Sequence, residues 1–120
     1  ATQALIANFD PLLRKSQDAR VIGMTSTVAS KPRAFWGAYA ASKAASDMLL
    51  ECYAEETRNT SKVRVAVVNP GATRTAMRAR AYPGEAPASV KPPQVVAARL
   101  VALLGEAFES GHREDVNQTS

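Results

Sequence analysis

The chain has 120 residues, enough for one modest hydrophobic core, and a formal net charge of +4 at pH 7. No apolar run approaches the roughly 20 residues that span a bilayer, so we expect neither a membrane segment nor a signal peptide. Basic residues are scattered among acidic ones and only 6% of residues are aromatic, which argues against nucleic-acid binding.

The single cysteine, Cys52, has no partner for an internal disulfide and no second cysteine with which to form a metal cluster. We therefore expect a protein of the reducing cytoplasm without a metal site. The simplest interpretation of Cys52 is a buried, inert thiol.

The first half of the chain predicts a helix, a strand and a second helix. Apolar residues recur at helical spacing in the opening segment, although Pro11 should bend or interrupt that helix. A short apolar run from about Arg20 to Thr25 predicts a buried strand, and residues 27–36 predict a loop. Residues 37 to about 59 predict a long helix, with one apolar stripe formed by Ala41, Ala45, Met48, Leu49 and Cys52.

The second half predicts another strand and another helix. Residues 63–68 are predicted to form the strand, which should end at Asn69-Pro70-Gly71. A loop with one helical turn follows, and helical spacing returns after Pro93. Residues 111–120 are interpreted as a polar tail that frays, with a solvated His112.

This order of elements predicts an α/β fold in which a helix crosses over between two parallel strands. Two parallel strands are too few to form a complete sheet, because parallel strands are normally covered by helices on both faces and by other strands at their edges. We therefore interpret residues 1–120 as a single region of a larger sheet.

Three polar features should meet at the carboxyl edge of this sheet, where α/β proteins bind ligands. Ser26 follows the first strand, Asn69-Pro70-Gly71 follows the second, and Tyr39 begins the long helix. Tyr39 and Lys43 project from the same helical face. A cation near a phenol favours the phenolate, which suits acid–base catalysis. The spacing alone leaves open the alternative of a half-buried tyrosine and a solvated lysine bridged to Asp47.

The pattern resembles the short-chain dehydrogenase/reductase family. That family has a serine at a strand end, then Tyr-x-x-x-Lys about a dozen residues later, then a strand leading to Asn-Pro-Gly and a threonine. Here these elements read "VIGMTS", "YAASK" and "VAVVNPGATRT", in the same order and spacing. The resemblance implies a Rossmann-like doubly wound parallel sheet and hydride transfer between NAD or NADP and a carbonyl or alcohol substrate.

The resemblance also implies residue roles. Tyr39 is expected to donate or accept the proton, and Ser26 to orient the substrate oxygen. Lys43 is expected to favour the phenolate and to bind the nicotinamide ribose. Pro70 and Gly71 are expected beside the nicotinamide.

The threonines after this turn have more than one interpretation. Thr75 is the expected contact to the carboxamide, with Thr73 a weaker candidate, and an N-cap is the alternative role for Thr75. Residues 74–87 correspond to the family's substrate-binding lid. Its three arginines could meet an acidic substrate, but we favour a solvated mobile loop. Phe35 and Trp36 either line the substrate pocket or pack the loop.

The dinucleotide-binding half of the family pattern has no counterpart here, because no two of the six glycines form G-x-G. The family's glycine-rich last strand has no clear match either. We expect the isolated chain to be inactive, as the carboxyl-terminal half of an enzyme. The alternative is a non-catalytic remnant that acts as an interaction or oligomerisation module. A homo-oligomer through the 37–59 helix is expected in either case.

Overall fold

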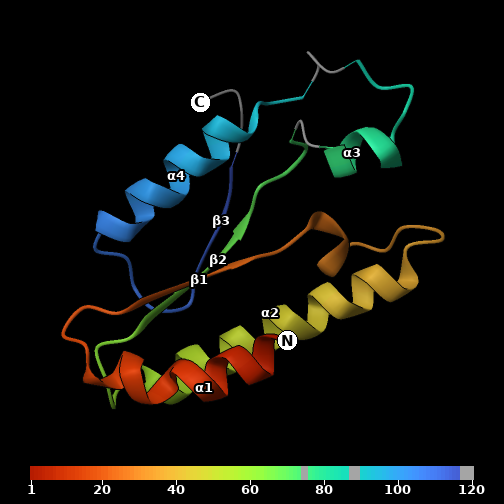
Figure 1. Ribbon diagram of the computed structural model, residues 1–120. Coiled ribbons are helices and arrows are strands. Elements are labelled where there is room, and N and C mark those ends of the chain that lie inside the picture. The colour runs from red at the N-terminus through yellow and green to blue at the C-terminus, as the bar shows by residue number, and fades with distance from the viewer. Residues whose placement is uncertain (74–75, 87–89, 117–120) are drawn as a thin grey trace.

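A computed structural model describes residues 1–73, 76–86 and 90–116, which form three parallel strands flanked by helices (Figure 1). The sheet has the order β1-β2-β3. In chain order the elements are α1 (Thr2–Lys15), β1 (Arg20–Met24), the 3₁₀ helix η1 (Thr27–Ala29), α2 (Gly37–Thr57), β2 (Arg64–Asn69), α3 (Ala76–Ala81), α4 (Pro93–Gly105) and β3 (His112–Asp115).

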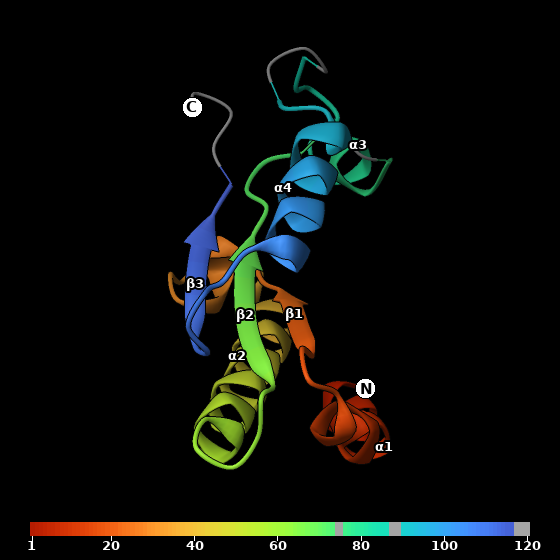
Figure 2. The same cartoon turned by 90° about the vertical axis from the view of Figure 1, so that its left-hand side faces the viewer.

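The helices cover the two faces of the sheet, with α1 and α2 on one side and α4 on the other (Figure 2). Strand β2 divides its side chains between these faces, because successive residues of a strand point in opposite directions. Val65 and Val67 pack with Leu50 of α2. Ala66 and Val68 pack in a second cluster with Leu103 of α4. The predicted parallel crossover between β1 and β2 is confirmed.

The end of the chain differs from its prediction, because His112–Asp115 form a third parallel strand beside β2. The prediction of a fraying tail is therefore wrong for these residues. Their polar composition hid the strand, since strand patterns are recognised by alternating apolar residues. The inward-facing side chains of this strand, His112 and Glu114, form polar contacts instead of packing in the hydrophobic core.

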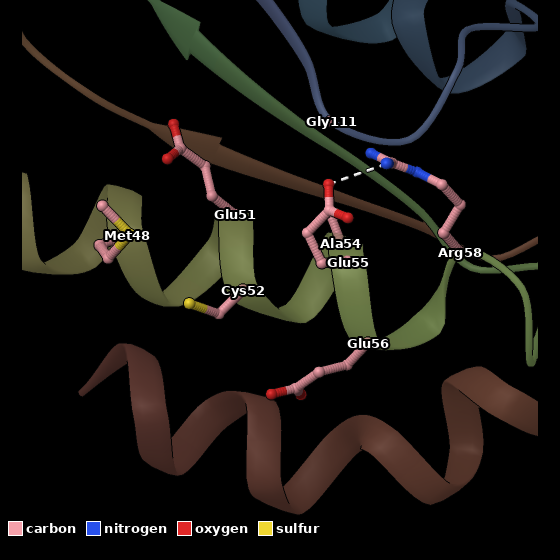
Figure 3. Close-up of a pocket in the computed structure, with 8 residues that line it drawn as sticks. All are labelled: Met48, Glu51, Cys52, Ala54, Glu55, Glu56, Arg58 and Gly111. Carbon is pink, nitrogen blue, oxygen red and sulfur yellow. Dashed lines mark ion pairs between the residues drawn. The ribbon is translucent and has the colours of Figure 1, made fainter.

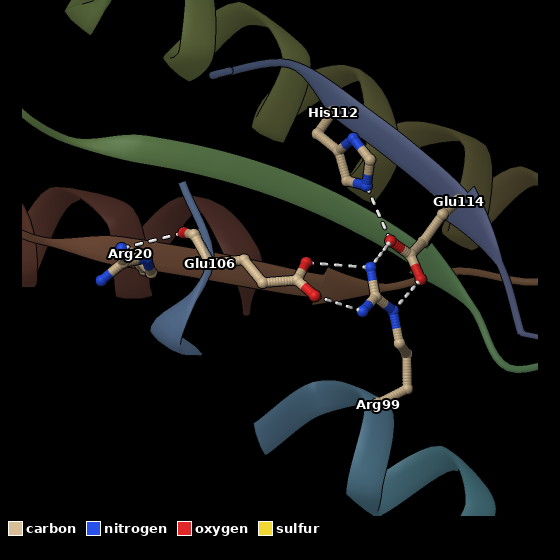
Figure 4. Close-up of polar contacts among 5 residues, drawn as sticks. All are labelled: Arg20, Arg99, Glu106, His112 and Glu114. Atoms are coloured by element: carbon tan, nitrogen blue, oxygen red, sulfur yellow. Dashed lines mark hydrogen bonds and ion pairs between the residues drawn. The ribbon is translucent and has the colours of Figure 1, made fainter. Parts of the chain in front are cut away.

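A charge cluster anchors β3 to α4 (Figure 4). Arg99 of α4 bridges two carboxylates, with Nη1 at 2.7 Å from Glu106 Oε1 and Nε at 2.5 Å from Glu114 Oε2. His112 Nε2 lies 2.7 Å from Glu114 Oε1, and its ring lies 5.6 Å from that of Phe108 at a tilt of 34°. The prediction of a solvated histidine is therefore wrong. The hydrogen bond from Arg99, with a further one from His112, lowers the pKa of Glu114 from 4.5 to about 2.

This pKa predicts a loss of stability in acid. A carboxyl with a depressed folded-state pKa stabilises the fold above its unfolded value of 4.5, and the contribution disappears as the pH falls towards about 2. We expect Glu114→Gln to lower the free energy of unfolding at neutral pH by about 1–2 kcal/mol, after allowance for solvent screening. Thermal unfolding of the full-length protein across this pH range measures the effect. Glu109→Gln, at an exposed position, should keep the acid dependence unchanged.

Helix α2 presents a different face to the core from the one expected. Its buried residues are Asp47, Leu50, Tyr53, Ala54 and Thr57. The predicted apolar stripe, including Cys52, is exposed, with Met48 59% exposed. The helix carries apolar residues on more than one side, so its spacing alone did not identify the face that meets β1 and β2. The prediction of a buried Cys52 is wrong.

Close contacts fix α2 against its neighbours. Gly23 of β1 leaves room for Leu50, since an added Cβ would overlap that side chain. Tyr53 donates a hydrogen bond of 2.7 Å to Asp10 of α1. Burial, together with this bond, raises the pKa of Tyr53 to about 12. Helix α1 itself runs through Pro11 without the predicted interruption. Pro11 and Ala7 are exposed, so water can satisfy the carbonyl that loses its donor.

None of the described helices has the length and apolar character needed to cross a membrane.

Candidate active site

A pocket of about 620 Å³ opens at the carboxyl ends of β1 and β2. Residues of η1, the start of α2, α3 and α4 complete its walls, and Figure 1 shows these elements gathered around one end of the sheet. Four of the expected site residues line this pocket: Ser26, Tyr39, Pro70 and Gly71. Lys43 is not among the described lining residues, and Thr75 lies outside the described part of the chain.

Ser26 is placed by the end of β1. The amide of the preceding Thr25 donates a hydrogen bond of 2.9 Å to the carbonyl oxygen of Val68, which ties this end of β1 to β2. Ser26 then caps η1 in an extended backbone conformation. Its half-buried side chain lies at the point where the chain leaves the sheet.

Tyr39 lies in the first turn of α2, with 36% of its surface exposed. The ring of Trp36 meets it edge-on, with 5.7 Å between centroids. This contact restricts the phenol ring from one side and leaves the rest of it open to the pocket. Trp36 lines the pocket as well, whereas Phe35 is fully exposed.

Lys43 lies one turn further along α2 and reaches the sheet. Its Nζ donates a hydrogen bond of 3.3 Å to the carbonyl oxygen of Met24, itself a pocket residue. Asp47 has other partners, accepting from Thr25 Oγ1 at 2.5 Å and from Arg113 Nη2 at 3.3 Å. The alternative of a solvated Lys43 bridged to Asp47 is therefore wrong.

The turn after β2 is held by its own side chains. Asn69 Oδ1 accepts a hydrogen bond of 2.9 Å from the amide of Gly71, and Asn69 Nδ2 donates one of 3.1 Å to Thr27 Oγ1. These bonds connect the turn to η1 across the pocket. Thr73 also lines the pocket and donates a hydrogen bond of 3.1 Å to the carbonyl oxygen of Gly71.

Lys91 supports this turn from behind. It is buried, and its Nζ donates a hydrogen bond of 2.8 Å to the carbonyl oxygen of Ala72. Burial lowers the pKa of Lys91, and the nearby Arg78 adds to the effect. Gly71 has a φ of +68°, and a Cβ there would lie 2.9 Å from the Lys91 ammonium nitrogen. The backbone conformation therefore favours glycine, and a larger residue would also displace the Lys91 ammonium group.

The outer rim of the pocket combines aromatic rings and guanidinium groups. The rings of Trp36 and Tyr82 lie 6.2 Å apart at 26°, and the guanidinium carbon of Arg33 is 5.4 Å from the first ring and 5.5 Å from the second. Arg78 lies over Tyr82 and pairs with Glu85 at 2.8 Å. Their hydrogen bonds raise the pKa of Arg78 and lower that of Glu85. These contacts join the loop before α2 to α3 and the residues that follow it.

A second depression, of about 560 Å³, lies along α2 (Figure 3). Its lining includes Cys52, Arg58 and three glutamates, one of which, Glu55, pairs with Arg58 at 2.8 Å. In Figure 3, Cys52 and Glu56 extend towards α1. None of the expected site residues lines this depression, whereas four of them line the larger pocket.

The sequence pattern of the family described as short chain dehydrogenase matches residues 1–86. The chain belongs to this family. As a short-chain dehydrogenase it is 42% identical over 105 residues to an uncharacterized oxidoreductase, YciK, of Escherichia coli strain K12. It is 39% identical over 66 residues to a vibriobactin-specific 2,3-dihydro-2,3-dihydroxybenzoate dehydrogenase of Vibrio cholerae. The matches cover 88% and 55% of this chain, but only 39% and 25% of the two relatives.

Solved structures give the same family. The E. coli YciK structure superimposes on 97% of this chain with a TM-score of 0.88 and 37% identity. A short-chain dehydrogenase from Shigella flexneri in complex with NADP superimposes on 96% with a TM-score of 0.87 and 38% identity. This chain covers 48% of each. The described fold is thus part of a Rossmann-like sheet.

The pocket residues fit one end of the nicotinamide cofactor that the family implies. A flat wall without a side chain at Gly71, a phenol and a nearby ammonium group suit a nicotinamide and its ribose. The phosphates have no such match in the sequence, because the G-x-G turn that would bind them is missing. The chain therefore fits the nicotinamide end of a dinucleotide.

Sequence reasoning missed the rim of the pocket. Arg33 precedes Trp36 by three residues in a segment interpreted only as a loop, and nothing in the sequence connects it to Tyr82. The Thr25–Asp47 hydrogen bond was also missed, because it joins residues 22 positions apart and no local pattern connects them. A cation close to an aromatic residue just before Tyr39 was the available signal for the rim.

Proposed function

We propose that the full-length protein is an NAD(P)-dependent oxidoreductase that transfers hydride between the cofactor and a carbonyl or alcohol substrate. The observation that supports this most strongly is the shared pocket of Ser26 and Tyr39, with Lys43 held against the Met24 carbonyl beside it. When bound, the nicotinamide supplies or accepts the hydride. Family membership supports the reaction class.

In this proposal Tyr39 is the general acid in reduction, and its hydroxyl gives a proton to the substrate oxygen. In oxidation the phenolate takes that proton back. Ser26 Oγ donates a hydrogen bond to the same oxygen and holds it against the phenol. The Lys43 ammonium stabilises the phenolate electrostatically.

The cofactor contacts are proposed on the same residues. Lys43 and Tyr39 would hold the nicotinamide ribose, Pro70 and Gly71 the ring, and Thr75 the carboxamide. Neighbours from S. flexneri and E. coli were solved with NADP and NADPH, which favours NADP(H) here. The V. cholerae relative acts on a ring that carries hydroxyl groups, which supports an alcohol or carbonyl substrate.

We favour this catalytic function over a remnant that serves only as an interaction module, because the pocket retains its set of polar groups. Oligomerisation remains compatible with it. The exposed apolar residues of α2, Met48 and Leu49, and those of α1, Leu5, Phe9 and Leu12, support a homo-oligomer through the 37–59 helix. We further propose a cytoplasmic location, on the basis of the single cysteine.

The test is turnover by the full-length protein. Purified protein should oxidise NADPH, followed by the loss of its absorbance, in the presence of a panel of aromatic and aliphatic aldehydes and ketones. Activity above that of a protein-free control supports the proposal. Tight NADPH binding with no turnover of any carbonyl, and no NADP⁺-dependent oxidation of the matching alcohols, would contradict it.

A further inference from the structure

The rim of the pocket carries a positive charge that no carboxylate in the described residues balances. Two arginines, Arg33 and Arg78, line the pocket, and no acidic residue does so among the described lining residues. Arg78 is neutralised by a two-point contact with Glu85, at 3.0 and 2.8 Å. Arg33 has no such partner in the described part of the chain. All 11 acidic side chains lie within that part.

Arg33 is nevertheless held in a defined place. Its guanidinium lies beside the Trp36–Tyr82 ring pair, within 5.5 Å of both centroids, and its Nη1 donates a hydrogen bond to the hydroxyl of Tyr82. A guanidinium has five N–H donors, and this contact uses one of them. Stacking on aromatic faces orients the planar group and leaves its other donors available, an arrangement that suits recognition of a carboxylate.

The position of Arg33 relative to the reacting groups limits what it can bind. Trp36 contacts both Arg33 and Tyr39, so the guanidinium and the phenol lie beside the same indole ring. Lys43 lies on the sheet side of Tyr39, whereas Arg33 contacts the lid through Tyr82. A molecule whose oxygen meets Tyr39 can therefore extend an anionic group to Arg33.

We infer that Arg33 is a specificity-determining residue and that the substrate carries a carboxylate on a planar, mainly apolar body next to its carbonyl or alcohol. This inference rests on the proposed oxidoreductase function. A single unbalanced guanidinium matches a singly charged group. The aromatic rings of Trp36 and Tyr82 provide apolar surface for the body of the substrate.

The test compares two aldehydes of the same size in the full-length enzyme, 4-formylbenzoate and 4-methylbenzaldehyde. We expect the wild-type protein to prefer the carboxylate in kcat/KM. Arg33→Met should reduce this preference about tenfold, by raising KM for the carboxylate substrate, because an exposed charge-assisted contact is lost. Arg33→Lys should retain part of it, and circular dichroism checks that both variants fold. The matched control is Arg80→Met, an exposed lid arginine that is not among the described pocket residues.

The KM for NADPH distinguishes the substrate from the cofactor as the source of the anion. We expect it to be unchanged in Arg33→Met. An increase in the NADPH KM with the aldehyde preference intact would assign Arg33 to the cofactor and overturn the inference. Equal preferences in wild type and Arg33→Met would also overturn it.

A binding measurement separates this inference from the proposed function. Calorimetry on the full-length protein compares benzoate with benzamide, without any turnover. Tighter binding of benzoate that Arg33→Met abolishes supports the anion site, even if neither aldehyde is reduced. Equal binding of the two compounds, or no binding of benzoate, contradicts it, even if the protein proves to be an active oxidoreductase.

Discussion

Tyr39→Phe is expected to reduce kcat of the full-length enzyme by about 10²-fold or more, because a positioned acid or base contributes roughly that factor. The phenylalanine ring should keep the edge-on contact with Trp36, so the pocket keeps its shape. The KM for the cofactor should change little. Steady-state kinetics with NADPH and any accepted carbonyl measures the effect.

Tyr53→Phe is the matched control for this variant. Tyr53 loses its hydrogen bond to Asp10 in that change but lies outside the pocket. We expect lower stability with normal kcat. Equal turnover by Tyr39→Phe and the wild-type protein would exclude Tyr39 as the proton donor.

Lys43→Met should affect both chemistry and cofactor binding. Removing the ammonium takes away the charge that stabilises the phenolate and leaves the Met24 carbonyl oxygen without its donor. We expect kcat to fall by about tenfold or more, the pH–rate profile for alcohol oxidation to move to higher pH, and the KM for NADPH to rise. Kinetics across a pH series, in both directions of the reaction, measures all three.

The control for the lysine variant is Lys62→Met, an exposed position just before β2. It removes the same charge from the protein without touching the pocket. Lys43 has only a structural role if Lys43→Met keeps both the wild-type pH–rate profile and the wild-type KM for NADPH.

Strong local patterns predicted most of the fold. The long helix from residue 37, the strand after residue 62 and their parallel crossover follow from apolar runs and the stop at Asn69-Pro70-Gly71. Strand β3 could not be predicted in this way, because its inward-facing His112 and Glu114 are polar. Arg99 stabilises Glu114, which in turn bonds His112, and an ion pair between residues 15 positions apart leaves no local signature.

In the candidate site, too, local patterns were predictable and contacts between distant segments were not. Ser26, Tyr39 and Gly71 were predicted because a parallel sheet brings the ends of its strands to one edge, so that sequence order determines proximity. The rim formed by Arg33 and Tyr82 could not be predicted, because it depends on the loop before α2 meeting the segment after α3. Helix spacing also left the buried face of α2 undetermined, and the contact between Leu50 and Gly23 identifies it.

The alternation of side chains along β2 makes this strand the common boundary of both hydrophobic clusters. Its residues Val65 to Val68 are almost completely buried, and β1 and β3 pair with its two edges. Neither α2 nor α4 can detach without exposing one face of the same strand. The two halves of the core should therefore unfold together, in one cooperative transition. The turn at Pro70 follows this strand directly, so both halves of the core hold it in place.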